Sequence, residues 1–291
     1  MNEHADPLAL ARHYETIGRY QAALDALEHA GEDVLHDPES WLLRSEALRG
    51  LDRDDEAVAA AQRGLELDPE DISLLDALAL SELGRDRVDE ARRALDAAIE
   101  LEPDHPTLHA HLALTLARLS RYADANTEVK EALRLAPWDA GVLRIRAQVA
   151  CLADYEPRLV RAYVEELLAV APDDPTGHAI LGTLAANKKD FRAAAQAFAE
   201  AARSDPSRQD IAETAREARV YAHPVLAPVR PIWRFGRWRA YFVFLALSVT
   251  LAVAHQNVLR EVLICCWLVI LVLSWLAPPV LRRLQRRRYG G

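Results

Sequence analysis

The sequence has few of the residues that build reactive or disulfide-bonded sites. Three of its 291 residues are cysteines, which is too few for a disulfide framework, and no cysteine pair has the spacing of a zinc site. We expect Cys151, Cys265 and Cys266 to be small buried side chains. The sequence also has no glycine-rich phosphate loop, no His-Glu-x-x-His motif and no nucleophile elbow. It therefore predicts neither an enzyme nor a cofactor, and no small-molecule substrate.

The first residues lack the features of an export signal. The N-terminal Met-Asn-Glu-His-Ala-Asp has neither a basic region nor an apolar core, so no secretory signal is predicted. Abundant Ala and Arg with few Lys and a single Met favour a high-GC bacterial genome. We expect the N-terminal region of the chain to stay in the cytoplasm.

Charge is distributed unevenly along the chain. Residues 225–291 contain ten arginines and a single acidic residue, Glu261, whereas residues 1–224 have a net charge of −18. An acidic body repels nucleic acid, while a basic tail suits an anionic lipid surface. This distribution argues against a nucleic-acid partner and favours membrane lipid.

Prolines recur with a nearly constant period. Successive spacings of 34, 34, 35 and 34 residues separate Pro69, Pro103, Pro137, Pro172 and Pro206. Each of them follows an amphipathic stretch, and proline neither continues a helix nor favours the helical conformation in the residue before it. Each period is therefore expected to end one helix and to start the next at a fixed phase.

Small residues recur in phase with these prolines, at positions where two helices would touch closely. One such position holds Ala23, Ala57, Ala91, Ala125, Val160 and Ala194, and another holds Ala30, Gly64, Ala98, Ala132, Leu167 and Ala201. An aromatic residue precedes the second helix at Tyr20, Tyr122 and Phe191. The fifth unit departs most, with Pro157 in place of the aromatic residue and Leu167 in place of a small one.

This pattern resembles the tetratricopeptide repeat (TPR), a 34-residue pair of antiparallel helices. The resemblance implies an all-α, right-handed α-solenoid of about six repeats at residues 4–37, 38–71, 72–105, 106–139, 141–174 and 175–208. A further helix is expected at 209–222, because Ile211, Ala215, Ala218 and Ala222 have helical spacing and a solenoid needs a terminal cap. The predicted solenoid domain is therefore 4–222.

The resemblance also implies a binding surface, because TPR stacks bind peptides or partner domains on the concave face formed by their first helices. The usual groove positions fall at Leu8, Arg12, Leu42, Glu46, Arg49, Asp76, Leu80, Leu83, Leu114, Ile145, Val149 and Thr183. This lining is largely apolar and lacks the Lys/Asn set with which chaperone-binding TPR domains clamp a terminal carboxylate. For each leucine, packing between adjacent repeats is the alternative role.

The sequence contains one local cluster of histidines, His105, His109 and His111. His105 precedes Pro106, outside the expected helix, and the other two residues point to different helical faces. Ordinary repeat positions and a metal site are the two alternatives for this cluster. We predict no metal ion.

The character of the sequence changes after His223. Three prolines, Pro224, Pro228 and Pro231, predict a linker that, with the following aromatic and basic segment, covers 223–239. Aromatic side chains alternate with arginines at its end, which is typical of the membrane interface. The expected interface anchors are Trp233, Arg234, Phe235, Arg237, Trp238 and Arg239, together with Arg282 and Arg283 beyond the second apolar stretch.

Two uncharged stretches follow this segment. The second, of 20 residues from 262 to 281, spans a hydrocarbon core of ~30 Å at ~1.5 Å per residue. The first has 15 uncharged residues from 240 to 254, and spans only if 255–259 lie at the far interface. We predict transmembrane helices at 240–259 and 262–281 that form a hairpin, with a re-entrant or monotopic hairpin as the alternative.

Arginines predict the orientation of this hairpin. Four precede the first stretch and five follow the second, whereas the turn has only Arg260, balanced by Glu261. Because cations stay on the cytoplasmic side, the TPR domain and the basic tail 282–291 are predicted to be cytoplasmic, at a bacterial inner membrane.

These features together predict a membrane-anchored adaptor that binds a protein partner, such as an amphipathic helix, in a largely apolar TPR groove. The alternative is a constitutive structural subunit of a larger membrane complex that is contacted through the transmembrane hairpin.

Overall fold

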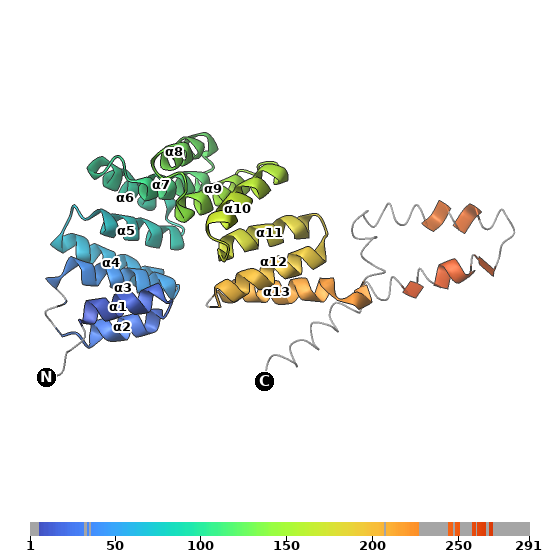
Figure 1. Cartoon of the computed structure of the whole chain (residues 1–291), viewed down its shortest axis with the longest axis horizontal. Coiled ribbons are helices and arrows are strands. Elements are labelled where there is room, and N and C mark those ends of the chain that lie inside the picture. The colour runs from blue at the N-terminus through green and yellow to red at the C-terminus, as the bar shows by residue number, and fades with distance from the viewer. Residues whose placement is uncertain are drawn as a thin grey trace. The chain divides into compact units, whose positions relative to one another are not determined.

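The computed structural model describes residues 6–31, 34, 36–206 and 208–226, and short stretches at 244–246, 248–250, 258–259, 261–265 and 268–269. The chain divides into two compact units, residues 1–171 and 172–291 (Figure 1). Each unit is described separately.

The described part of the chain is all-α, as predicted, with thirteen α-helices. Unit 1 contains α1 (Pro7–Thr16), α2 (Tyr20–Glu28), α3 (Pro38–Gly50), α4 (Asp54–Leu67), α5 (Ile72–Gly84), α6 (Val88–Leu101), α7 (Pro106–Arg118), α8 (Tyr122–Leu135), α9 (Ala140–Leu152) and α10 (Pro157–Val170). Unit 2 contains α11 (Pro175–Asn187), α12 (Phe191–Ser204), α13 (Gln209–Ala222) and a 3₁₀ turn at Pro224–Leu226.

The periodic prolines determine where the second helix of a repeat ends. Helices α4, α6, α8, α10 and α12 all end two residues before one of them, so that proline never enters a helix from which it would remove a hydrogen bond. The next helix then begins three residues after the proline. The 34-residue proline period of the sequence is therefore the period of the helix pairs.

A left-handed residue joins the two helices of every repeat. Its φ lies between 52° and 70° at Gly18, Asp52, Asp86, Ser120, Asp154 and Lys189. The N–H of the following residue donates to the carbonyl five positions earlier, as in Arg53 N to Leu48 O at 2.9 Å. This bond is the Schellman arrangement, which pairs carbonyls that the end of a helix leaves free. The turn is the same in all six repeats, although glycine occupies it only once.

Aspartates cap most of the first helices. Asp37, Asp71, Asp139 and Asp174 each accept a hydrogen bond from a backbone N–H two or three residues later, at 2.7–3.0 Å. Such bonds satisfy donors that a helix start leaves unpaired. His105 occupies the equivalent position before α7 and makes no such cap.

The small residues lie where the sequence pattern places close helix contacts. Ala23, Ala57, Ala91 and Ala125 have no exposed surface in unit 1. Ser45 is equally buried and donates from Oγ to the carbonyl oxygen of Ala57 at 2.9 Å, which joins the two helices of the second repeat. Larger side chains at these positions would hold the helices apart.

The first and fifth repeats depart from the others. Helix α2 has 9 residues where α4 has 14, and no proline lies in phase after it. In the fifth repeat, Pro157 occupies the first turn of α10, where a missing N–H costs nothing. Val160, Val164 and Leu167 of α10 are buried, so Val160 and Leu167 replace the small residues of the other repeats without loss of the helix.

Unit 2 has its own core, built by α11, α12 and α13. Ala185, Ala194, Phe198 and Ala215 form a buried cluster that joins the three helices. The ring of Phe191 stacks on that of Tyr221 with 5.5 Å between their centroids. Helix α13 therefore packs against α12.

The cysteines differ from expectation. Cys151, in the last turn of α9, is exposed, and so is Cys265. Their predicted burial is wrong, and for Cys151 the position in the last turn of a helix leaves the side chain exposed.

Among the described residues, no helix combines the length and the apolar character needed to cross a bilayer. The predicted spans 240–259 and 262–281 lie mostly outside the described residues, and the tail 282–291 lies wholly outside them. The same holds for all the predicted interface anchors, Trp233, Arg234, Phe235, Arg237, Trp238, Arg239, Arg282 and Arg283.

Candidate functional site

The first helices of successive repeats contact one another through unit 1. Helix α1 contacts α3, α3 contacts α5, α5 contacts α7, and α7 contacts α9. Between α3, α5 and the start of α7 lies a pocket of about 190 Å³. Its lining consists of Leu42, Glu46, Arg49, Ile72, Ser73, Asp76, Ala77, Leu80, His105 and Leu108. Five of the residues predicted to line a groove therefore come together there: Leu42, Glu46, Arg49, Asp76 and Leu80.

Helical spacing explains how two elements build this pocket. Leu42, Glu46 and Arg49 are four and three residues apart on α3, so their side chains share one face of that helix. Asp76 and Leu80 have the same relation on α5. The residues of each helix therefore form a row, and the two rows face the pocket together.

Acidic groups dominate the electrostatics around Glu46. Burial raises the pKa of this carboxyl, and the charges of Glu15 and Asp76 raise it further. The charge of Arg49 lowers the pKa, and its effect is smaller than that of Glu15 but larger than that of Asp76. The field of these neighbours at Glu46 is therefore negative. Its carboxylate makes no hydrogen bond or ion pair with any residue that the structure describes.

Two nitrogen atoms in the pocket lining are also without partners. The Nε of Arg49 and the Nδ1 of His105 are buried and make no hydrogen bond within the described part of the chain. By contrast, Asp76 accepts a hydrogen bond at 2.6 Å from Nδ1 of His111, which ties α5 to α7. Unpaired buried polar atoms are costly unless a ligand or solvent satisfies them.

Three predicted groove residues are part of the core of unit 1. Leu83 and Ile145 are each 6% exposed and Val149 is 3% exposed, and all three belong to one buried cluster that joins α5 to α9. Leu114 packs against the same cluster and is partly buried. At these positions the alternative role, packing between repeats, is the observed one, because successive first helices approach closely enough to bury the side chains. The accessible lining is therefore more polar than the sequence suggested.

The remaining predicted groove residues lie outside the pocket. Leu8 packs against the N-terminal cluster of unit 1. Arg12 forms an ion pair with Glu39. Thr183 is exposed on α11, in unit 2, and donates from Oγ1 to the carbonyl of Ala179 at 3.0 Å. None of them is brought to the pocket on α3 and α5.

Half of the pocket lining was not predicted from the sequence. Ile72, Ser73 and Ala77 lie on the same face of α5 as Asp76 and Leu80, at spacings of three and four residues. That spacing is a signal by which they can be found. His105 and Leu108 carry no such signal, because they come from the next repeat and only the stacking of α7 on α5 brings them to the pocket.

The three clustered histidines have separate roles. His109 is buried and makes two hydrogen bonds of 2.7 Å, from Nδ1 to Glu128 and from Nε2 to the carbonyl of Pro103. Burial acts to lower the pKa of His109, but these hydrogen bonds and the charge of Glu128 outweigh it and raise the pKa above its usual value. His111 pairs with Asp76. No group of potential metal ligands gathers around the histidines or elsewhere among the described residues.

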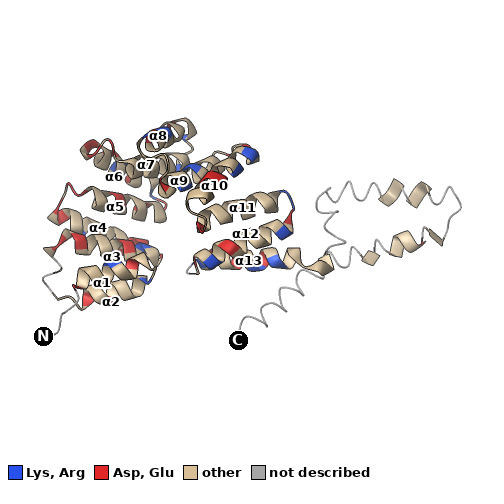
Figure 2. Ribbon diagram, viewed as in Figure 1, with Lys and Arg blue, Asp and Glu red and all other residues tan. Residues whose placement is uncertain are grey.

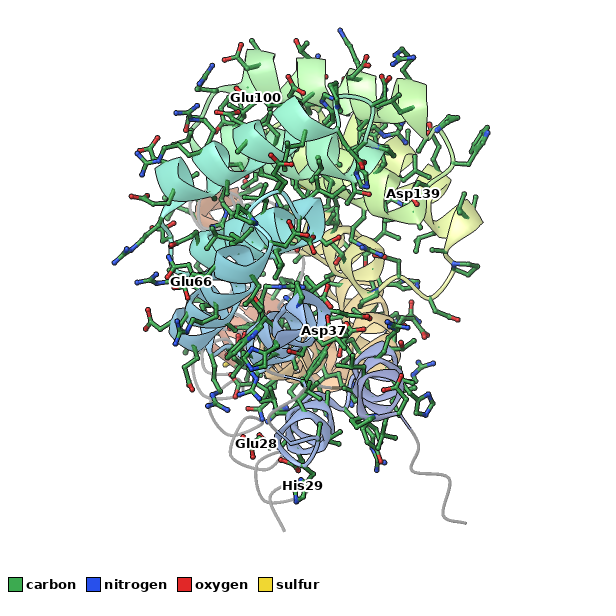
Figure 3. All side chains as sticks on the ribbon, turned by 90° about the vertical axis from the view of Figure 1, so that its left-hand side faces the viewer. Glu28, His29, Asp37, Glu66, Glu100 and Asp139 are labelled. Carbon is green, nitrogen blue, oxygen red and sulfur yellow. The ribbon has the colours of Figure 1, made fainter. Side chains whose placement is uncertain are left out.

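Unit 1 carries almost all the negative charge of the repeats. Residues 1–171 contain 35 Asp and Glu against 18 Lys and Arg, and acidic side chains occur throughout the helices of unit 1 (Figure 2). Many lie at the junctions between repeats, such as Glu28, Asp37, Glu66, Glu100 and Asp139 (Figure 3). The pocket includes the first residues of α5 and the cap position of α7, so it lies near these acidic junctions.

A family model for the tetratricopeptide repeat matches residues 8–72, 77–140 and 160–208. These ranges make up more than half of the sequence, so the chain belongs to the TPR family. Repeats of this family are scaffolds for protein–protein interaction and are generally not catalytic. The match omits 141–159, which includes Pro157 of the most divergent repeat.

Solved structures show the same fold at low identity. TTC0263, a thermophilic TPR protein of Thermus thermophilus, is 22% identical with a TM-score of 0.57, over 62% of this chain and 98% of that one. A tetratricopeptide repeat protein from Parabacteroides merdae is 15% identical with a TM-score of 0.63, over 72% and 82%. PilW, a type IV pilus biogenesis factor, is 18% identical with a TM-score of 0.54, over 73% and 99%. No curated protein matches the sequence.

Proposed function

We propose that this protein is a membrane-anchored scaffold that binds a segment of a protein partner on the first-helix face of unit 1. The observation that carries the proposal is the pocket on α3 and α5, where Leu42 and Leu80 supply apolar surface beside Glu46 and Asp76. A surface with both characters suits an amphipathic helix or a comparable segment, which has an apolar stripe and a polar flank. The net negative charge of unit 1 favours a basic partner, mainly through the rate of association.

Several features of the sequence support the membrane part of the proposal. The stretches 240–254 and 262–281 have no charged residue, and arginines flank them on the side predicted to be cytoplasmic. In this proposal they form a hairpin in a bacterial inner membrane, and the TPR repeats face the cytoplasm. The partner would thus be held close to the membrane surface.

Crosslinking tests the binding face. The full chain is expressed in bacterial membranes, and its crosslinked partners are quantified by mass spectrometry for the wild type, Leu80→Glu and Leu67→Glu. Leu80 lines the pocket, whereas Leu67 is exposed at the end of α4, outside it. We expect Leu80→Glu to lose its partners and Leu67→Glu to keep them, with circular dichroism verifying that both variants fold. Equal capture by the two variants would place binding elsewhere on the protein.

Truncation tests the anchor. Removal of 224–291 is expected to release the repeats from carbonate-washed membranes while the helical circular-dichroism signal per residue remains. A truncated protein that still sediments with the membranes would contradict the anchor. If the truncated protein is released but no longer crosslinks to any partner, while Leu80→Glu has no effect, the alternative role of a subunit contacted through the hairpin is favoured.

A further inference from the structure

The pocket on α3 and α5 has a size that suits one side chain. Its volume of about 190 Å³ is below the ~300–1,000 Å³ that small-molecule sites usually have. Leu42, Ile72, Leu80 and Leu108 provide its apolar walls. Long side chains with a polar end bury their alkyl part along such walls and keep the polar end near charged groups.

The polar groups of the pocket favour a cationic end over a neutral or anionic one. Glu46 has no ion-pair partner among the described residues, and its neighbours Glu15 and Asp76 together outweigh Arg49. A cation placed beside Glu46 would therefore be attracted both by this carboxylate and by the field around it. An anion would be attracted only by Arg49 and the ring of His105. It would be repelled by the carboxylates of Glu46, Asp76 and Glu15.

Long-range charge acts in the same direction. Unit 1 has about twice as many acidic as basic residues, and acidic side chains lie at its repeat junctions (Figure 3). Such a field raises the encounter rate of a basic segment, and it falls off with salt.

We propose that this pocket takes one lysine or arginine side chain of the partner segment, with Glu46 as its paired carboxylate. This inference rests on the proposed function, because it specifies which residue of the partner occupies the binding face. Asp76, which is held by His111, also lines the pocket and adds to the attraction.

The inference is tested with peptides of defined composition. The probes are fluorescein-labelled, Ala/Gln-based helical peptides with two leucines on one face and a central Lys, Arg, Gln or Glu. Binding to the full chain in a non-ionic detergent is followed by fluorescence anisotropy at fixed salt. We expect the Lys and Arg peptides to bind about tenfold or more tightly than the Gln peptide, because a charge-assisted hydrogen bond is roughly twice as strong as a neutral one.

Matched variants separate the pocket from general charge attraction. Glu46→Gln and Glu100→Gln each remove one negative charge from unit 1, but Glu100 is exposed at the end of α6 and lies outside the pocket. We expect Glu46→Gln to reduce Lys-peptide affinity about tenfold, to the level of the Gln peptide, while Glu100→Gln changes it by less than about twofold. The melting temperature of both variants verifies the fold.

Two results would overturn the inference. One is an equal loss of affinity in Glu46→Gln and Glu100→Gln, and the other is the absence of Lys-peptide binding at millimolar concentration. If either occurs while partner crosslinking still depends on Leu80, the proposed function stands and only the identity of the bound side chain is wrong. If peptide binding depends on Glu46 but partner crosslinking is unchanged by Leu80→Glu, the inference that the pocket binds a cationic side chain is supported. The proposed binding face for the partner is then refuted.

Discussion

Replacing Gly64 by alanine should have two opposing effects on stability, a gain in helix propensity and a loss in packing. Gly64 lies inside α4, at a position where four of the other five repeats have alanine, and alanine is a better helix former by about 1 kcal/mol. A Cβ atom at this position would lie 2.6 and 2.7 Å from the two methyl carbons of Leu74 and 3.1 Å from Cβ of Trp41. Carbon atoms in contact are ordinarily ~3.5–4.0 Å apart. Leu74 has no exposed surface, so its side chain has no open space into which to rotate.

The packing effect is expected to win. Extra carbon atoms in a packed core cost about 1–3 kcal/mol, against which the propensity gain is smaller. We expect Gly64→Ala to lower the free energy of unfolding by about 1–2 kcal/mol, and the melting temperature by ~2–4 °C for each kcal/mol. Urea and thermal unfolding followed by circular dichroism measure both quantities.

Two further variants identify the cause. In Gly84→Ala the added Cβ meets the carboxyl group of Asp54, the end of a partly exposed side chain that is able to rotate away. This variant is expected to be as stable as the wild type or slightly more stable. Leu74→Val removes the methyl groups that Gly64→Ala meets, so the double variant should lose less stability than the two single variants predict together. A Gly64→Ala protein more stable than the wild type would refute the packing argument.

Other predictions follow from the repeat turn, the buried histidine and the small-residue positions. Lys189→Gly should stabilise unit 2 by ~0.5–1 kcal/mol in urea unfolding, because its φ of 59° favours glycine, and Gly18→Ala, at a φ of 70°, should destabilise by a similar amount. Because the pKa of His109 is raised in the folded state, its stabilising contribution is fully present below about pH 6.5 and is lost as pH rises through the raised value. His109→Gln should therefore cost more stability at pH 6 than at pH 9, and an equal cost at both would contradict this. Ala125→Leu should lower stability by ~1–3 kcal/mol, since Ala125 has no exposed surface, and an unchanged melting temperature would mean that the repeat register is wrong.

The fold was largely predictable because its signals are local and repeat. Each proline ends a helix by its own covalent structure, and the alanines in phase with it fix which faces touch. The turns were less visible, since the left-handed position holds glycine only at Gly18 and holds aspartate, serine or lysine in the other five repeats. The turn conformation is set by the reversal of chain direction between two antiparallel helices, and not by the type of residue at the left-handed position.

The binding surface was predictable only in part. Helical spacing places Glu46 and Asp76 on the first helices, and the structure brings them to one pocket. Helical spacing does not indicate how deeply a neighbouring helix covers a side chain. For this reason Ile145 and Val149 were expected in an open groove, whereas the structure buries them. Burial depends on the distance between repeats, and the side chains of two helices set that distance together.

The contacts of unit 1 run mainly between helices that are adjacent or next-but-one along the chain. Low sequence separation between contacting residues favours fast folding, and a stack of this kind opens one repeat at a time instead of all at once. Among the α-helices that the structure describes, α1 and α2 are the shortest, and this pair contacts a neighbouring repeat on one side only. Hydrogen exchange should therefore be fastest there and slowest in α5 to α8, where each repeat is held from both sides. Because the pocket lies between α3 and the start of α7, it extends from the repeat next to α1 and α2 into the part of unit 1 where exchange should be slowest. A bound segment would stiffen α3 and thereby slow the exchange of the repeats before it.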